Sequence, residues 1–291
     1  MSIPESVRAG PSPRRQRIRN AIPALVAGSV VALSLGLAAC QTVETTEPGA
    51  VGVDRKQKML VSSEQVEQAA AQAYAQELEK ARQKGVLDRD QRLLQRVRGI
   101  TQRLIPITRV FREDAVNWDW EVHVQDSKEL NAYAMPGGKI MVYSGLVERL
   151  DLTDDEISAV VGHEIAHALR EHSRERVSRA YAQQLALAGA AAVAGVGEGA
   201  LNLANMIATV TFQLPHSREQ EAEADRIGLE LMARAGYNPQ AAVNVWRKMG
   251  QANESGGPPE FLSTHPSGES RIKDLESLLP KVMPLYRSSG R

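Results

Sequence analysis

The chain has 291 residues, enough for one large domain or two small ones, and its 35 lysines and arginines balance 35 aspartates and glutamates. A formal net charge of +0 gives no electrostatic case for nucleic acid as a partner. Aromatic residues make up only 4% of the chain, whereas alanine, leucine, glutamate, glutamine and arginine abound, a balance that favours helices.

Residues 1–39 have the composition of an export signal that is removed from the mature protein. Arginines gather near the start, and the stretch from Ala21 to Ala39 is uncharged and mostly apolar. It ends in Leu37-Ala38-Ala39-Cys40, which resembles the bacterial lipobox. The resemblance implies cleavage before Cys40, the only cysteine of the chain, and diacylglycerol on its thiol. A plain membrane anchor is the alternative, because an apolar stretch of this length nearly spans a bilayer.

The residues after the cysteine bear on location and on domain organisation. Gln41 stands where an aspartate would favour retention in the inner membrane, so we expect the periplasmic face of the outer membrane. Residues 40–58 are rich in Thr, Glu, Pro and Gly and are expected to form a flexible tether. Residues 59–291 are expected to form the folded domain.

The remaining elements follow from periodicity and from turn residues, and no internal repeat is visible. In chain order we expect helices over Ser63–Lys84 and Asp88–Ile105, strands over Trp118–Gln125 and, after a Pro136-Gly137-Gly138 turn, Lys139–Tyr143, and then helices over Thr153–Ser173, Arg218–Ala235, Pro239–Met249 and Glu269–Leu279. Tyr181–Phe212 is predicted to form two short apolar helices joined around Gly195–Gly199. Neither half is long enough to span a bilayer, so a dip into a lipid surface is the alternative there.

One motif is typical of metal chemistry: His163-Glu164-Ile165-Ala166-His167. Residues four apart share a helix face, so two imidazoles could grip one zinc ion at about 2.0–2.1 Å from a single rigid element. Glu164 could then reach a water molecule on that zinc and take its proton as the water attacks a peptide carbonyl. A surface helix with two incidental histidines is the alternative reading.

A catalytic zinc also needs a third protein ligand and an open position. In the predicted helix that contains Glu221-Ala222-Glu223-Ala224-Asp225, the side chains of Glu221 and Asp225 share a face. One could bind the metal while the other orients a histidine by accepting its ring N–H. Gly228 would let this helix approach another closely. A solvated acidic face is the alternative.

Together these motifs resemble peptidase family M48, the HtpX-like zinc endopeptidases. Two further segments match: Asn131–Gly138 is similar to the strand beside the family's active site, and Thr264-His265-Pro266 is similar to its C-terminal loop. The resemblance covers roughly residues 60–279 and implies a mainly helical α+β, zincin-like (gluzincin) domain with a small sheet. It also implies these roles: one zinc ion held by His163, His167 and Glu221, Glu164 as general base, and Asp225 as the partner of His163.

Other residues carry less defined expectations. The segment Ala134–Val142 could bind an extended substrate as an added strand, with Ala134, Met135, Pro136, Gly137 and Gly138 as the candidate contacts. An ordinary sheet edge is the alternative. His265 could stabilise the oxyanion, act as a latch in the open zinc position, or bond only to backbone. We expect structural or surface roles for His123, His172 and His216.

The family's membrane-embedded members carry several long apolar spans, whereas this chain has none after its signal. It therefore resembles the periplasmic lipoprotein branch, which is linked to quality control of outer-membrane proteins. We expect a zinc endopeptidase that acts on unfolded or misassembled envelope proteins, is anchored through Cys40 and contacts the outer-membrane assembly machinery. A periplasmic chaperone or assembly factor with little or latched proteolysis is the alternative.

Overall fold

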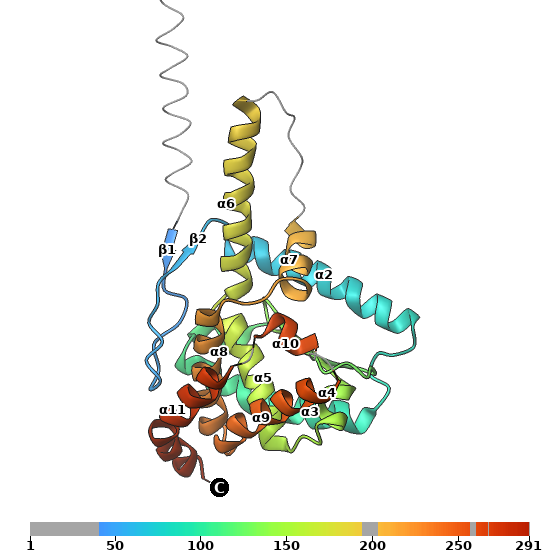
Figure 1. The fold of residues 1–291 in the computed structure, drawn as a ribbon, viewed down its shortest axis with the longest axis vertical. Coiled ribbons are helices and arrows are strands. Elements are labelled where there is room, and N and C mark those ends of the chain that lie inside the picture. Colours follow the sequence, from blue (N-terminus) through green and yellow to red (C-terminus); the bar gives the residue numbers. More distant parts are fainter. Residues whose placement is uncertain (1–40, 194–202, 257–259, 267, 291) are drawn as a thin grey trace, which may run out of the picture. The chain divides into compact units, whose positions relative to one another are not determined.

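The computed structural model describes residues 41–193, 203–256, 260–266 and 268–290 (Figure 1). The chain divides into Met1–Gln41 and Thr42–Arg291, and the fold described below is that of the second unit. The predicted signal, Cys40 and the expected joint around Gly195–Gly199 lie outside the described residues.

Helices dominate the described part of the chain and confirm the predicted mainly helical α+β class. The α-helices are α2 (Ser63–Gln83), α3 (Gln91–Leu104), α4 (Ser144–Arg149), α5 (Asp154–Leu169), α6 (His172–Val193), α7 (Leu203–Phe212), α8 (Arg218–Arg234), α9 (Gln240–Gly256), α10 (Glu260–Thr264) and α11 (Glu269–Ser288). Two 3-10 helices, η1 (Ile105–Val110) and η2 (Glu113–Asn117), follow α3. The strands are β1 (Gln41–Val43), β2 (Gln57–Met59), β3 (Glu121–Gln125), β4 (Ala132–Met135) and β5 (Lys139–Tyr143).

A three-stranded sheet has the strand order β3-β5-β4. β3 runs parallel to β5, and β4 runs antiparallel to it. Gly137 and Gly138, with φ of 78° and 82°, form the turn between β4 and β5, in the left-handed region that favours glycine. A Cβ on Gly138 would lie only 2.7 Å from the Trp120 ring. In the order β3-β5-β4, β5 is the middle strand and β4 is an edge strand.

Helices cover both faces of this sheet. Tyr133, Met135 and Met141 pack in a cluster with α2 and α7. Ile140 and Val142 belong to the main core, which also contains residues of α3, α5 and α8. Since both faces are covered, all residues of β4 and all but Tyr143 of β5 are buried, and both strands are mostly apolar.

Helices α5 and α8 lie side by side (Figure 1). A capping box formed by Thr153 and Glu156 begins α5. A Cβ on Gly228 of α8 would lie 2.8 Å from the backbone nitrogen of His163 and 2.9 Å from the carbonyl carbon of Gly162. The close helix approach expected at Gly228 is confirmed, and it places the predicted metal motifs beside each other.

Replacing Gly228 with valine should push α5 and α8 apart, because the new side chain meets backbone atoms that cannot rotate away. Over-packing of this kind costs typically about 1–3 kcal/mol of unfolding free energy. Gly99→Ala in α3, where a Cβ meets no described atom within 4 Å, is the matched control and should stabilise by about 0.4–1 kcal/mol. Urea denaturation of both variants tests this; wild-type stability in Gly228→Val would contradict the tight crossing.

The segment before α2 differs from the flexible tether expected for residues 40–58. Val51 and Val53 are buried in the main core. Gln57 is 0% exposed, and its amide donates to the Arg170 carbonyl. The Thr-, Glu-, Pro- and Gly-rich composition predicted disorder, but the alternating valines and the buried amide dock the segment onto the domain.

Arg55 ties this docked segment to α6 and α8. Its guanidinium donates to Glu175 and to Glu223, both at 2.6 Å. Burial alone would raise the pKa of Glu175, but hydrogen bonds from Arg55, Gln220 and Gln57 outweigh it and bring the pKa to about 2. The folded chain therefore holds Glu175 in its charged form.

Acid should weaken the fold through this ion pair. Because the pKa of Glu175 in the folded chain lies below its ordinary value of 4.5, the unfolded chain takes up the proton first as the pH falls. The stabilisation is complete above about pH 4.5 and is lost as the pH approaches about 2. Urea denaturation across this window should show a falling unfolding free energy, with a smaller slope in Arg55→Met. Equal slopes in the two proteins would contradict the assignment.

Several helix boundaries differ from the expected ones. α5 ends at Leu169, before the expected Ser173, because Glu171 has a φ of 49° and breaks the helix. α6 is a single helix of 22 residues that begins at His172, whereas a short helix beginning at Tyr181 was expected. α11 continues to Ser288, beyond the expected Leu279. Among the helices that the structure describes, none combines the length and apolar character needed to cross a membrane.

Candidate metal centre and active site

Side chains from α5, α8 and the segment after α10 converge in one buried cluster. The Nε2 atoms of His163 and His167 are 3.0 Å apart. Glu221 places Oε1 3.4 Å from His167 Nε2 and Oε2 3.5 Å from His163 Nε2. His265 Nδ1 lies 3.0 Å from Glu221 Oε1 and 3.3 Å from His163 Nε2. The structure thus brings the three predicted ligands together with His265, each offering a donor atom within 4.8 Å of the others.

This donor set fits a zinc ion. Imidazole nitrogens and a carboxylate oxygen are its usual ligands in catalytic sites, which keep a further position open. Asp225 and Glu221 raise the pKa of His163 to about 9, although burial alone would lower it. The carboxylates that favour a positive charge on this ring would equally favour a divalent cation between the donor atoms. Burial lowers the pKa of His167 well below its ordinary value, which keeps that ring neutral.

Asp225 lies where it was expected, with Oδ1 3.1 Å from His163 Nδ1. Arg271 holds both carboxylates of α8: it donates to Asp225 at 2.6 and 2.7 Å, and its Nη1 lies 2.6 Å from Glu221 Oε2. The guanidinium also stacks over the Trp246 ring at 3.7 Å. No role was predicted for Arg271, and its only signal in the sequence was its place after the Thr-His-Pro motif.

Glu164 lies beside the cluster, between α5 and β4. Its Oε2 accepts a hydrogen bond from the Ala134 backbone N–H at 3.2 Å, and its Oε1 is 3.6 Å from His265 Nε2. Within the described part of the chain, Oε1 is buried without a hydrogen-bond partner. Burial raises the pKa of this carboxyl. A carboxylate in this position, with one oxygen free, can accept a proton from a reacting group.

The outer edge of β4 faces the cleft beside Glu164. The backbone N–H of Ala134 points to Glu164, and that of Ala132 donates to its neighbour's side chain, Asn131 Oδ1, at 2.9 Å. Neither N–H is used in pairing with β5. An extended peptide that replaced these bonds could lie along β4 as an added strand.

The structure brings only part of the predicted substrate segment to this cleft. Ala134 lines it, whereas Met135 is 0% exposed and packs towards α2. Pro136, Gly137 and Gly138 lie at the turn into β5, away from the residues that line the cleft. Because β5 is the middle strand, the part of Ala134–Val142 beyond the turn cannot accept an added strand; the expectation was wrong there.

The cleft is nearly closed, with a cavity of about 90 Å³. Phe212, at the end of α7, packs edge-on against Tyr133 of β4, with ring centroids 5.0 Å apart. The Phe261 N–H of α10 donates to the Leu130 carbonyl, just before β4 begins. The end of α7 and the end of α10 line the cleft opposite β4, so an extended peptide would need them to move.

Two histidines expected to be structural or on the surface lie directly against the site. His172 is 0% exposed, and its Nδ1 is 2.8 Å from His167 Nδ1. The His216 ring lies 4.0 Å from the His167 ring and 4.9 Å from the His265 ring, between centroids. Arg176 donates to His216 Nε2 at 2.9 Å.

Comparison with known proteins is consistent with this site. The model of Peptidase family M48 matches residues 92–279. Mitochondrial metalloendopeptidase OMA1 of Saccharomyces cerevisiae is 37% identical over 177 residues, which are 58% of this chain and 50% of that protein. Metalloendopeptidase OMA1, mitochondrial, of Homo sapiens is 33% identical over 178 residues, 57% of this chain and 34% of that protein.

The Beta-barrel assembly-enhancing protease of Escherichia coli is 30% identical over 193 residues, 62% of this chain and 39% of that protein. The chain thus spans about half or less of the length of these relatives. The family match covers well over half of the chain and contains the whole histidine and carboxylate cluster. The chain belongs to peptidase family M48.

Proposed function

We propose that this protein is a zinc-dependent endopeptidase. One observation carries the proposal: the Glu164 carboxylate is buried between the histidine and carboxylate cluster and the outer edge of β4, with Oε1 free to accept a proton. The metal site would supply the ion, Glu164 the proton acceptor, and the strand edge a place for an extended peptide.

His163, His167 and Glu221 would hold the ion. When bound, zinc lowers the pKa of a water molecule towards about 7 and polarises a carbonyl group. Glu164 would take the proton of the attacking water at Oε1 and later give it to the leaving amine. Before a substrate strand takes over the Ala134 N–H, that N–H holds the other carboxylate oxygen and leaves Oε1 as the free proton acceptor.

Unfolded or misassembled proteins of the cell envelope are the proposed substrates. Strand addition recognises extended backbone and is tolerant of side chains, which suits substrates that have lost their fold. The lipobox-like sequence before Cys40 supports a lipid anchor on the periplasmic face of the outer membrane. The name of the E. coli relative links that protein to β-barrel assembly, which supports assembly machinery as a partner.

Metal content and cleavage of unfolded casein test the proposal on the purified protein. We expect one zinc per chain, loss of cleavage after chelation, and recovery when zinc is restored. A chain that contains no zinc, or that cleaves equally well with the metal removed, would rule out the proposed chemistry.

The closed cleft favours a second candidate, an envelope assembly factor whose proteolysis is latched. The cavity of about 90 Å³ cannot hold an extended peptide, and His265 lies among the metal-binding side chains. In this case a strain that lacks the protein should be rescued equally well by wild type and by Glu164→Gln. Rescue by wild type alone would favour the peptidase.

A further inference from the structure

We propose that His172 is a positioning residue for the metal site, which fixes His167 in the one tautomer that can bind a metal through Nε2. The inference rests on the proposed function, since it concerns the same ion. It assigns a role to a residue whose sequence position gave no indication of one.

The hydrogen-bond chain runs from α8 through His172 to the cluster. Glu223 Oε2 lies 3.0 Å from His172 Nε2, and His172 Nδ1 lies 2.8 Å from His167 Nδ1. A carboxylate only accepts, so the His172 proton resides on Nε2, and its Nδ1 offers a lone pair. His167 must then donate from Nδ1, which leaves the lone pair of its Nε2 directed at His163 and Glu221.

Two arginines hold the carboxylate of Glu223, at which this series of hydrogen bonds begins. Arg55 donates to Glu223 at 2.6 and 3.1 Å, and Arg170 donates at 3.1 Å. The Arg170 side chain is 1% exposed. Two charged donors on one carboxylate favour its ionised form, so Glu223 remains an acceptor for His172.

The break between α5 and α6 brings His172 to this place. On a continuous helix, His172 would lie five positions after His167 and point to another side. Glu171, with a φ of 49°, turns the chain so that the two rings meet.

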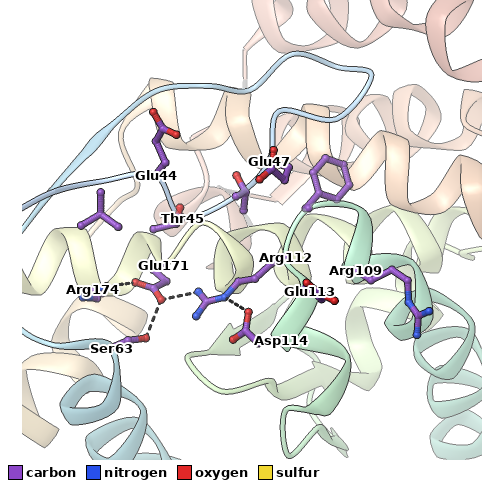
Figure 2. A pocket seen from close by; sticks show the side chains of 13 residues that line it. Glu44, Thr45, Glu47, Ser63, Arg109, Arg112, Glu113, Asp114, Glu171 and Arg174 are labelled. Carbon is purple, nitrogen blue, oxygen red and sulfur yellow. Dashed lines mark hydrogen bonds and ion pairs between the residues drawn. The ribbon is translucent and has the colours of Figure 1, made fainter.

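A cluster of charged side chains holds this turn. Glu171 accepts hydrogen bonds from Ser63, Arg112 and Arg174, at the wall of a cavity of about 700 Å³ that also contacts the docked N-terminal segment (Figure 2). These hydrogen bonds hold Glu171 in the turn that brings the His172 ring to His167.

The two histidine ligands are oriented in parallel ways. Asp225 contacts Nδ1 of His163, and His172, backed by Glu223, contacts Nδ1 of His167. Partners of this kind fix ring orientation and raise ligand basicity, and their loss typically costs about 10–100-fold in metal affinity. Removal of the His172 acceptor should therefore weaken zinc binding without removing a ligand.

Zinc affinity, measured by chelator competition on the full chain, tests the role. His172→Phe keeps a ring but offers no acceptor, and we expect zinc binding about 10–100-fold weaker. His172→Asn retains an acceptor oxygen near the Nδ1 position and should restore most of the affinity. His123→Phe is the matched control. His123 lies on β3, outside the cluster, and its Nδ1 is 2.6 Å from Asp88 Oδ2. Its replacement should leave zinc affinity unchanged.

A folded His172→Phe that binds zinc as tightly as wild type would overturn the role of His172 and leave the proposed function intact. A wild type that binds no zinc would instead remove the proposed function. Nitrogen-15 spectra of zinc-loaded wild type give a readout that does not depend on any variant folding. We expect protons on His167 Nδ1 and His172 Nε2; a proton on His172 Nδ1 would also overturn the inference.

Discussion

Glu164→Gln should lose most of its proteolytic activity while it keeps its zinc and its fold. Glutamine has nearly the same shape and can still accept the Ala134 N–H through its amide oxygen, but it cannot take a proton from water. General acid–base catalysis contributes typically about 10²–10⁴-fold, so we expect kcat/KM on casein or a peptide to fall by that factor. Zinc content should remain at the wild-type level.

Glu148→Gln in α4 provides the matched control, because this exposed glutamate undergoes the same chemical change away from the cleft. Its kcat/KM should equal that of wild type. If Glu164→Gln retained full activity with zinc bound, another group would have to serve as the base, and the role of Glu164 would be refuted.

Glu221→Gln should release the metal. Glu221 is 0% exposed and provides the carboxylate that faces both histidines. Loss of its charge leaves only a weak, neutral ligand and leaves Arg271 without one of its two acidic partners. We expect zinc affinity to fall by more than the roughly 10–100-fold that outer partners typically contribute, with parallel loss of cleavage.

Glu219→Gln is the control for this change, since Glu219 lies on the same helix with its side chain 65% exposed. It should bind zinc like wild type. Thermal unfolding of the metal-free proteins separates a binding defect from a folding defect. Stoichiometric zinc of unchanged affinity in Glu221→Gln would show that the ligand set has been assigned wrongly.

Spacing within single helices was sufficient to predict much of the site. His163 and His167 are four apart, and so are Glu221 and Asp225, and the α-helix places such pairs on one face whatever surrounds them. The glycine at 228 likewise indicated a close helix approach, because only a residue without a side chain permits one. These inferences depend on local geometry, which the sequence encodes directly.

Composition was a poorer guide to the docked N-terminal segment. Its Thr, Glu, Pro and Gly content is typical of a tether, yet Val51, Val53 and Gln57 are buried. Whether the segment docks depends on the surface that it meets. Its valines are buried because a core surface is available, and the Gln57 amide is stable when buried because the Arg170 carbonyl accepts from it.

By itself, the sequence determined the candidate metal motifs and the mainly helical class, because these depend on residue types at fixed helical spacing. Its motifs taken together also carried the resemblance to the family, which the family match confirms. The tertiary structure alone decided that β4 and not β5 presents its edge, that α7 and α10 close the cleft, and that His172 and Arg271 contact the candidate ligands His167 and Glu221. Those contacts join residues far apart in the chain or separated by a helix break, and no periodicity in the sequence records which distant surfaces will meet.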